Sequence, residues 1–311
     1  MPYNSLTSRS DVQALVPEDV SSEIIQAVQT ESAALALFRR VTMSSNQQRM
    51  PVLAALPSAY WVSGDTGVKQ TTEMQWANKF LFAEEIAAIV PIPEAVLDDT
   101  SFDIWGEIRP RLAEAIGRTL DAAVFFGVNK PTSWPADVAA MCVAAGNTVT
   151  RGTATAAAGG IAQDVNTAMG LVESDGFAPS GFYTRTTYKA TLRAGRDTTG
   201  QKLLDMSSNS IEGLPVSYGM PGLWPTGTGS AELFVGDFAN AILAVRQDLT
   251  YKVLTEAVIT DNSGVIQYNL PQQDMVALRV VARYAYQIPN PVNYENLTEA
   301  TRSPFAVLRA P

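Results

Sequence analysis

Histidine is absent from this chain of 311 residues, and Cys142 is its only cysteine. These absences exclude the usual zinc-binding sets, histidine-based catalytic triads and any disulfide within the chain. Long apolar runs are also missing: none approaches the roughly 20 residues that a membrane helix needs, and the N-terminus lacks the basic and apolar regions of a signal peptide. We therefore expect a soluble intracellular protein without a membrane partner.

Basic residues are in the minority, with 22 Lys and Arg against 31 Asp and Glu and a net charge of -9. Because affinity for nucleic acid rests on clustered Lys and Arg, we expect only weak, non-specific contact with DNA. Cofactor motifs are absent too: there is no GxxxxGK, no GxSxG and no GxGxxG between a strand and a helix. No cofactor is expected. With 46% hydrophobic residues, the chain can bury a substantial core in one elaborate domain or two simple ones.

One tripeptide invites a catalytic interpretation. Asp65, Thr66 and Gly67 match the active-site signature of aspartic proteases. The residues around them are polar, whereas a catalytic Asp needs a buried loop between apolar strands, so a hairpin turn is favoured. A hydrolase that uses Asp65 stays open as an alternative. The pairs Glu84–Glu85 and Asp98–Asp99 are typical of a strand and of a helix start, and no catalytic or metal-binding residue is predicted.

The chain is organised around the stretch from Val90 to Gly127, which predicts a short extended lead-in and one long helix. Its apolar residues recur at three- and four-residue steps and therefore share one face: Trp105, Ile108, Leu112, Ile116, Leu120 and Ala123. Acidic and hydroxyl residues between Asp98 and Asp103 offer caps at the start, and Gly127 gives the stop. Pro110 leaves two possibilities: the regular helix begins there, or a longer helix bends there.

Two other features precede this helix. After an extended arm over residues 1–16, the pattern from Pro17 to Arg40 predicts an amphipathic helix, packed on its own domain or docked on a neighbouring subunit. Strands are then expected at 49–53, 59–63 and 80–90, around a turn at 63–67. This segment is rich in hydroxyl groups and contains Trp61 and Trp76. A hairpin so poor in core residues predicts a projecting arm that buries its apolar residues only against a partner.

The remainder predicts a loop over 127–160, an α/β module and a return to strands. The module has helices at 161–174 and 185–194, strands at 181–184 and 233–236, and a loop-rich edge between them. Further strands are expected at 241–246, 250–259, 265–270 and 275–288. The proline-rich tail from Pro289 is expected to run along the surface.

Several stretches in this order resemble one protein family across nearly the whole chain. They include LVPEDVSSEIIQAVQTESA, RMPVLAALPSAYWVSGDTGVKQT, IVPIPEAVLDDTSFDIWGEIRPRLAEAIGRTLDAAVFFG, GFYTRTTYKATLRAGRDTTGQ, SIEGLPVSYGMP, LFVGDFANAILAVRQDLTYKV and DMVALRVVARYAYQIPNP. The family is that of the major capsid proteins of tailed bacteriophages, with the Hong Kong 97 type α+β fold.

The resemblance implies a division of the chain into an N-terminal arm and helix (1–42), an extended (E) loop (43–88), a peripheral (P) domain with a spine helix (89–134 and 249–289), an α/β axial (A) domain (135–248) and a C-terminal tail (290–311). It implies a structural protein that forms pentamers and hexamers, and an icosahedral shell around packaged double-stranded DNA. It implies assembly in the host bacterial cytoplasm, with a portal protein as a partner and with separate scaffold and decoration proteins as candidate partners.

It also implies roles for single residues. The E-loop residues Trp61, Asp65, Lys69 and Trp76 are expected to contact a neighbouring subunit, and Pro110 is a hinge candidate in the spine helix.

Some relatives link subunits through an isopeptide bond between an E-loop lysine and a P-domain asparagine, promoted by a glutamate. Here Asp274 and Val281 fall at those two P-domain positions, so Lys69 is expected to make a polar contact instead. The short segment before the first helix implies a separate scaffold or none. The alternatives are an encapsulin-like nanocompartment that encloses protein cargo, and a tail or decoration protein.

Overall fold

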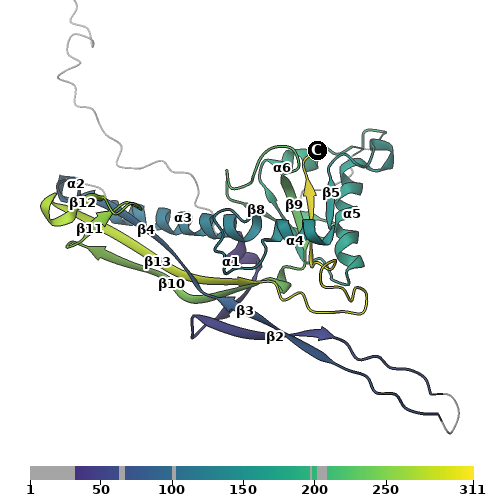
Figure 1. Ribbon diagram of the computed structural model, residues 1–311. Coiled ribbons are helices and arrows are strands. Elements are labelled where there is room, and N and C mark those ends of the chain that lie inside the picture. Colours follow the sequence, from purple (N-terminus) through teal and green to yellow (C-terminus); the bar gives the residue numbers. More distant parts are fainter. Residues whose placement is uncertain (1–31, 63–66, 100–102, 197, 202–208) are drawn as a thin grey trace, which may run out of the picture.

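The structure, a computed structural model, describes residues 32–62, 67–99, 103–196, 198–201 and 209–311. A long helix lies along an elongated sheet, a compact module with a second sheet lies at one end, and a hairpin arm projects away from both (Figure 1). In this part of the chain no helix is both long and apolar enough to cross a membrane.

The long helix is α3, Ile104–Phe126, preceded by the short α2, Glu94–Asp99. Its first turn is capped by Asp103, whose side chain accepts from the backbone N–H of Gly106, and it ends at Gly127, which has a left-handed φ of 68°. Both ends agree with the sequence prediction. Pro110 lies inside the helix, so the possibility that the helix begins at Pro110 is wrong.

A four-stranded sheet lies beneath α3 in the order β1-β10-β13-β4. These strands span Arg39–Thr42, Ile242–Leu254, Met275–Gln287 and Glu84–Pro93. Alternate residues of β13 share one face and are buried, as predicted: Val276, Leu278, Val280, Ala282, Tyr284 and Tyr286. The two strands expected at 241–246 and 250–259 are largely one bulged strand, β10, and a separate short hairpin follows, made by β11 (Val258–Thr260) and β12 (Ile266–Asn269).

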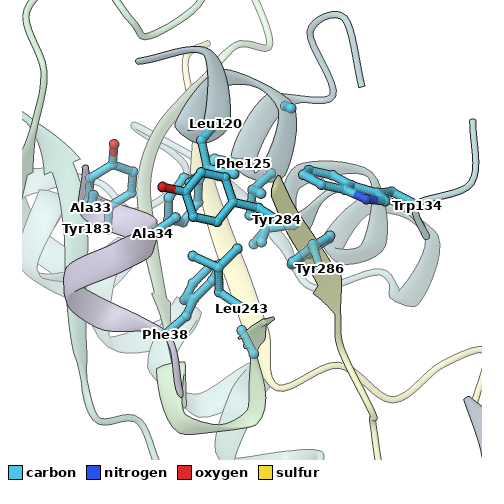
Figure 2. Close-up of a cluster of buried hydrophobic side chains, with 14 of the residues drawn as sticks. Ala33, Ala34, Phe38, Leu120, Phe125, Trp134, Tyr183, Leu243, Tyr284 and Tyr286 are labelled. Atoms are coloured by element: carbon cyan, nitrogen blue, oxygen red, sulfur yellow. The ribbon is translucent and has the colours of Figure 1, made fainter. Parts of the chain in front are cut away.

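The N-terminal helix differs from its prediction. Residues 17–31 lie outside the described residues, and α1 covers only Ala33–Leu37. The expected end at Arg40 is wrong, because the chain becomes extended at Phe38 and Arg39 pairs with Ile242 in the sheet. Figure 2 shows Phe38 of this segment beside Leu243 and Tyr284, below Leu120 of α3.

A buried carboxylate ties α1 to α3. Asp121 is fully buried and accepts from the Ser32 hydroxyl at 2.6 Å, from the Ala33 N–H at 2.9 Å and from the Ala34 N–H at 3.0 Å. The two N–H groups are among those that a helix start leaves without a partner, so Asp121 caps a helix 88 positions away in the sequence.

The module at the end of α3 is a six-stranded sheet covered by helices, in the order β5-β14-β9-β6-β8-β7. Its strands span Thr148–Thr150, Phe305–Arg309, Ala231–Gly236, Gly181–Arg185, Leu214–Gly219 and Ser210–Ile211. Its helices are α4 (Val138–Ala145), α5 (Gly160–Ser174) and α6 (Tyr188–Ala194). Single 3-10 turns are Ala156–Ala158, Phe238–Asn240 and Leu270–Gln272.

Two expectations about this module are wrong. The predicted loop over 127–160 contains α4, whose residues are apolar on nearly every side and therefore carry no helical period. The predicted surface tail instead returns as β14, between β5 and β9. Phe305, Val307 and Leu308 are buried there, because a central strand is covered on both faces.

Candidate assembly interface

The projecting arm is a two-stranded antiparallel ribbon of β2 (Gln47–Ala55) and β3 (Gln75–Phe82). Beyond the ribbon, the described residues 56–62 and 67–74 form no strand, so the strand expected at 59–63 is wrong for residues 59–62. The two sides still contact one another: the Ser58 N–H donates to Thr72 Oγ1 at 2.8 Å, and the Tyr60 hydroxyl donates to the Gln70 carbonyl at 2.8 Å. The arm is therefore held by local hydrogen bonds and not by a core.

The arm exposes its apolar side chains. Trp61 is 100% exposed, Val68 83% and Trp76 63%. Tyr60, Val62, Met74 and Phe80 are also exposed. A two-stranded ribbon has no second layer on which to bury such groups, and clustered exposed apolar residues mark an interaction surface.

The base of the arm is rooted in the body. Leu81, Ala83 and Met43 are buried against the sheet residues Ile242, Ala244 and Ala285. The Trp134 indole N–H donates to the Phe82 carbonyl at 3.1 Å, and the Gln287 amide donates to the Phe80 carbonyl at 3.0 Å. The arm thus has a fixed root in the body.

The residues predicted for subunit contacts fall as follows. Trp61, Lys69 and Trp76 lie exposed on the arm, and their contact with another subunit stays a prediction. Asp65 lies outside the described residues. Pro110 lies on the spine, away from the arm, and its role as a hinge also stays a prediction.

Sequence reasoning missed other arm residues, among them Tyr60, Val62, Val68 and Met74. The polar segment that marked the arm contains them all, so counting every apolar residue in that segment, and not only tryptophans, would have found them.

A second exposed apolar surface lies at the far end of the elongated sheet. Val253 of β10 is 49% exposed, Val258 of β11 52% and Ile266 of β12 61%. Figure 1 places the β11–β12 hairpin at the opposite end of α3 from the compact module. Within the described residues, exposed apolar side chains thus gather on two separate extensions, the arm and the end of the elongated sheet.

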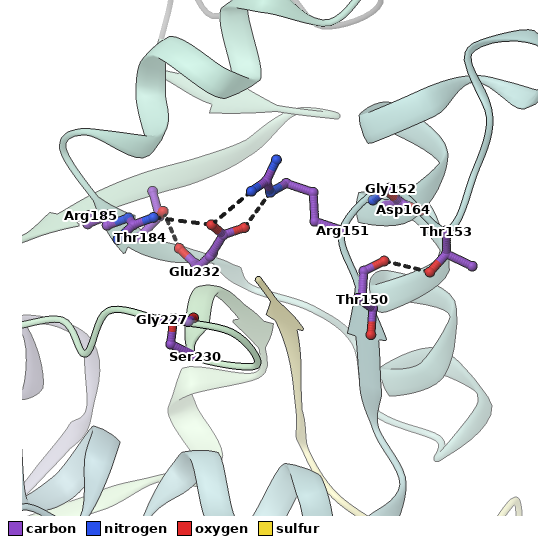
Figure 3. A network of polar contacts seen from close by, with 10 residues as sticks. All are labelled: Thr150, Arg151, Gly152, Thr153, Asp164, Thr184, Arg185, Gly227, Ser230 and Glu232. Carbon is purple, nitrogen blue, oxygen red and sulfur yellow. Dashed lines mark hydrogen bonds and ion pairs between the residues drawn. The ribbon is translucent and has the colours of Figure 1, made fainter. Parts of the chain in front are cut away.

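The buried carboxylates Glu232 and Asp164 of the module both have hydrogen-bond partners, which indicates a structural role. Glu232 is 2% exposed and accepts from Arg151 Nε at 2.7 Å and from Arg185 Nη2 at 3.1 Å (Figure 3). The hydrogen bond to Glu232 raises the pKa of Arg151 above its ordinary value. Asp164 accepts the N–H groups of Gly152 and Ala154 and so fixes the neighbouring turn. Among the described residues, no group of three or more His, Cys, Asp or Glu side chains is placed to hold a metal.

The model of the phage capsid family matches residues 13–293. The chain belongs to the phage capsid family. It is 26% identical over 287 residues to a major capsid protein of Staphylococcus phage 80alpha, which covers 91% of this chain and 85% of that protein.

Solved structures agree with this family. A structure from Microbacterium phage Oxtober96 is 39% identical, with a TM-score of 0.87 over 99% of this chain and 100% of that one. At 18% identity, a capsid of an empty GTA particle computed with C5 symmetry shares the fold, with a TM-score of 0.69 over 97% of this chain and 98% of that one.

Membership of the phage capsid family confirms the predicted Hong Kong 97 type α+β fold. The family and the curated relative are structural proteins of the capsid, so the chain is a virion component and not an enzyme. The hydrolase interpretation of Asp65 therefore has no support, and the nanocompartment alternative is not favoured.

Proposed function

We propose that this capsid protein assembles with itself into pentamers and hexamers, which close into an icosahedral shell around the double-stranded DNA of a tailed phage. The observation that carries the proposal is the arm, which leaves Trp61 fully exposed where its own body cannot cover it. The fivefold symmetry used for the GTA capsid, which shares this fold, supports a ring of copies.

In such a ring the arm of one copy lies over the next. This is a head-to-tail contact between two different surfaces, and such contacts generate closed rings when the rotation between neighbouring copies closes on itself. Trp61, Asp65, Lys69 and Trp76 supply the arm side of the contact, with aromatic groups at its centre. The apolar end of the elongated sheet, with Val258 and Ile266, offers a receiving surface of matching character.

The proposal includes the division into N-terminal arm (1–42), E-loop (43–88), P-domain (89–134 and 249–289), A-domain (135–248) and tail (290–311), with strand β14 of the tail lying in the sheet of the A-domain. It also includes a portal protein, separate scaffold and decoration proteins, assembly in the host cytoplasm and weak contact with DNA. The net charge of -9 supports a container that does not grip its contents.

Deleting residues 58–78 tests the proposal. The deletion removes the outer arm and leaves its buried root, so we expect a soluble, folded body that fails to form closed shells. Circular dichroism checks the fold, and electron microscopy checks the particles. Shells of normal size from the deleted chain would contradict the proposal. Images of particles from the full chain that show protein cargo instead of DNA, portal and tail would favour the nanocompartment.

We further propose that Pro110 is a hinge at which the spine helix bends when the shell expands. Proline lacks the N–H that would bond one turn back, which lowers the cost of a bend. Space for the movement is present, because a cavity of about 310 Å³ lies beside the helix, lined by Pro110, Ala113, Gly117, Leu35 and Leu249 among others.

The substitution Pro110→Ala tests the hinge. Restoring the backbone hydrogen bond should stiffen the helix and slow or block expansion, measured as the change of particle diameter over time. Arg109→Ala is the matched control, since it changes an exposed side chain in the same turn and keeps the backbone donors. Equal expansion in the Pro110→Ala particles and the parent would contradict the hinge.

A further inference from the structure

The segment 288–304 joins β13 to β14 without helix or strand and is here named the C-terminal strap. In Figure 1 it is the yellow stretch that loops past the end of the elongated sheet and below α5 before it returns as β14. It contacts both the arm and the six-stranded module.

The strap touches the arm farther out than the buried root does. The Val292 N–H donates to the Leu53 carbonyl at 3.2 Å, and the Tyr294 hydroxyl donates to the Pro57 carbonyl at 2.9 Å. On the other strand Lys79 forms an ion pair with Glu299. Both sides of the arm are therefore held farther out than Phe80, where the root ends. A two-stranded ribbon without such support has little rigidity of its own.

The strap takes its own position from Asp175, the buried residue at the end of α5. Asp175 accepts from the Asn296 amide through Oδ1 at 2.8 Å and from the Ser303 N–H through Oδ2 at 2.8 Å. Its backbone carbonyl accepts from the Asn293 amide at 2.7 Å. One residue of the module thus holds the strap at three points.

A buried arginine stiffens the strap between these contacts. Arg302 is 3% exposed, and its guanidinium donates to the Asn290 side chain at 3.1 Å, to the Asn296 carbonyl at 2.6 Å and to the Asn290 carbonyl at 2.9 Å. These bonds pull the two ends of the strap together. Three donors in a planar fork define the loop although it lacks regular structure.

We propose that the C-terminal strap positions the arm for docking, with Tyr294 and Glu299 as its positioning residues on the arm side and Asn296 as its tie to the module. This inference rests on the proposed function of the arm. The strap fixes the direction in which the arm leaves the body, and so presents Trp61 and Trp76 to the next copy in a preorganised state. Preorganisation matters because affinity falls with the fraction of molecules in the competent state.

The test measures the direction of the arm in the unassembled full-length chain. Spin labels are attached through Thr71→Cys on the arm and Asn166→Cys on α5, both exposed positions, while Cys142 is buried and is not labelled in the folded state. The double substitution Tyr294→Phe with Glu299→Gln removes the hydrogen bond to the Pro57 carbonyl and the negative charge that pairs with Lys79. Asn296→Ala separately removes a tie to the module. Glu295→Gln, an exposed acid of the strap, is the matched control.

We expect a narrow distance distribution in the parent chain and the control, and a broad one in the double variant and in Asn296→Ala. If one molecule in ten keeps a competent arm, the concentration of chain needed to form closed shells rises about tenfold. A distribution that stays narrow in the double variant would overturn the inference, and so would equal broadening in Glu295→Gln.

A different experiment would contradict the proposed function of the arm. Shells formed after deletion of residues 58–78 would remove the role of the arm in assembly, whatever the spin labels report. Loss of shells in that deletion, together with a narrow distribution in the strap variants, would remove the role of the strap alone.

Discussion

The spine helix and the arm both carry large aromatic side chains, but they use them in opposite ways. Phe125 of α3 is fully buried, with its ring centre 4.3 Å from that of Tyr183 and 5.2 Å from that of Phe38. Trp61 of the arm is fully exposed. Burial of apolar area stabilises whichever state buries it. The spine aromatics therefore stabilise the folded subunit, whereas the arm aromatics are available to stabilise a contact between copies.

Among the substitutions that test this comparison, we expect Phe125→Ala to cause the largest loss of subunit stability. Truncation by Phe125→Ala removes buried ring area and leaves a cavity among Phe38, Tyr183 and Phe234, so we expect the free energy of unfolding to fall by about 3–5 kcal/mol. Urea unfolding of the unassembled chain measures the loss. Val143→Ala, at a half-exposed position of α4, is the control and should change stability by less than about 1 kcal/mol. A similar small loss in Phe125→Ala would show that the spine is not the stabilising core.

Asp121 connects the two regions that are compared, because it ties the spine helix to the segment that leads toward the arm. Asp121→Asn keeps the shape but turns one acceptor oxygen into a donor, which faces the Ser32 hydroxyl or a backbone N–H of α1. We expect a loss of about 1–3 kcal/mol in the free energy of unfolding. An unchanged stability would mean that the cap is dispensable.

The pH dependence gives an independent check on Asp121. Burial raises the pKa of this carboxyl above its ordinary value of 3.8, outweighing the hydrogen bonds that lower it. The folded chain therefore binds this proton more tightly than the unfolded chain does. The resulting contribution to stability is complete below pH 3.8 and is lost as pH rises through the raised pKa. Asp121→Asn should lose this part of the slope, measured by unfolding at a series of pH values.

The sequence predicted correctly those elements whose signal lies within the element itself. The α3 boundaries followed from Asp103, Gly127 and a regular apolar period, all readable within the helix itself. The alternation in β13 was equally local. Helix α4 was missed because VAAMCVAA has no polar face, and β14 because its burial depends on strands from distant parts of the chain.

The same distinction applies to the assembly surface. Polar composition around Trp61 and Trp76 was enough to predict an arm that does not form its own core. The contacts that hold the arm were not predictable, because Tyr294 lies 237 positions from its acceptor Pro57 and nothing near either residue indicates the pairing. The cap of α1 by Asp121 escaped for the same reason. Tertiary proximity, and not the residue types, carries this information.

The smallest expected effect on the subunit is also the one that tests the role of the arm most directly. Trp61 touches no core, so Trp61→Ala should change the free energy of unfolding by less than about 0.5 kcal/mol. If its indole is covered by a neighbour in the shell, the same substitution removes a large buried aromatic from every contact, and aromatic truncations of that kind cost about 2 kcal/mol or more. Closed-shell yield at increasing concentrations of chain measures the second effect, with Val128→Ala, an exposed apolar residue outside the arm and the strap, as the control. A Trp61→Ala chain that is as stable as the parent but needs a higher concentration to close shells would separate folding from assembly at one residue. Unchanged shell closure would show that no neighbouring copy covers Trp61, and the contact would then rest on the remaining arm residues.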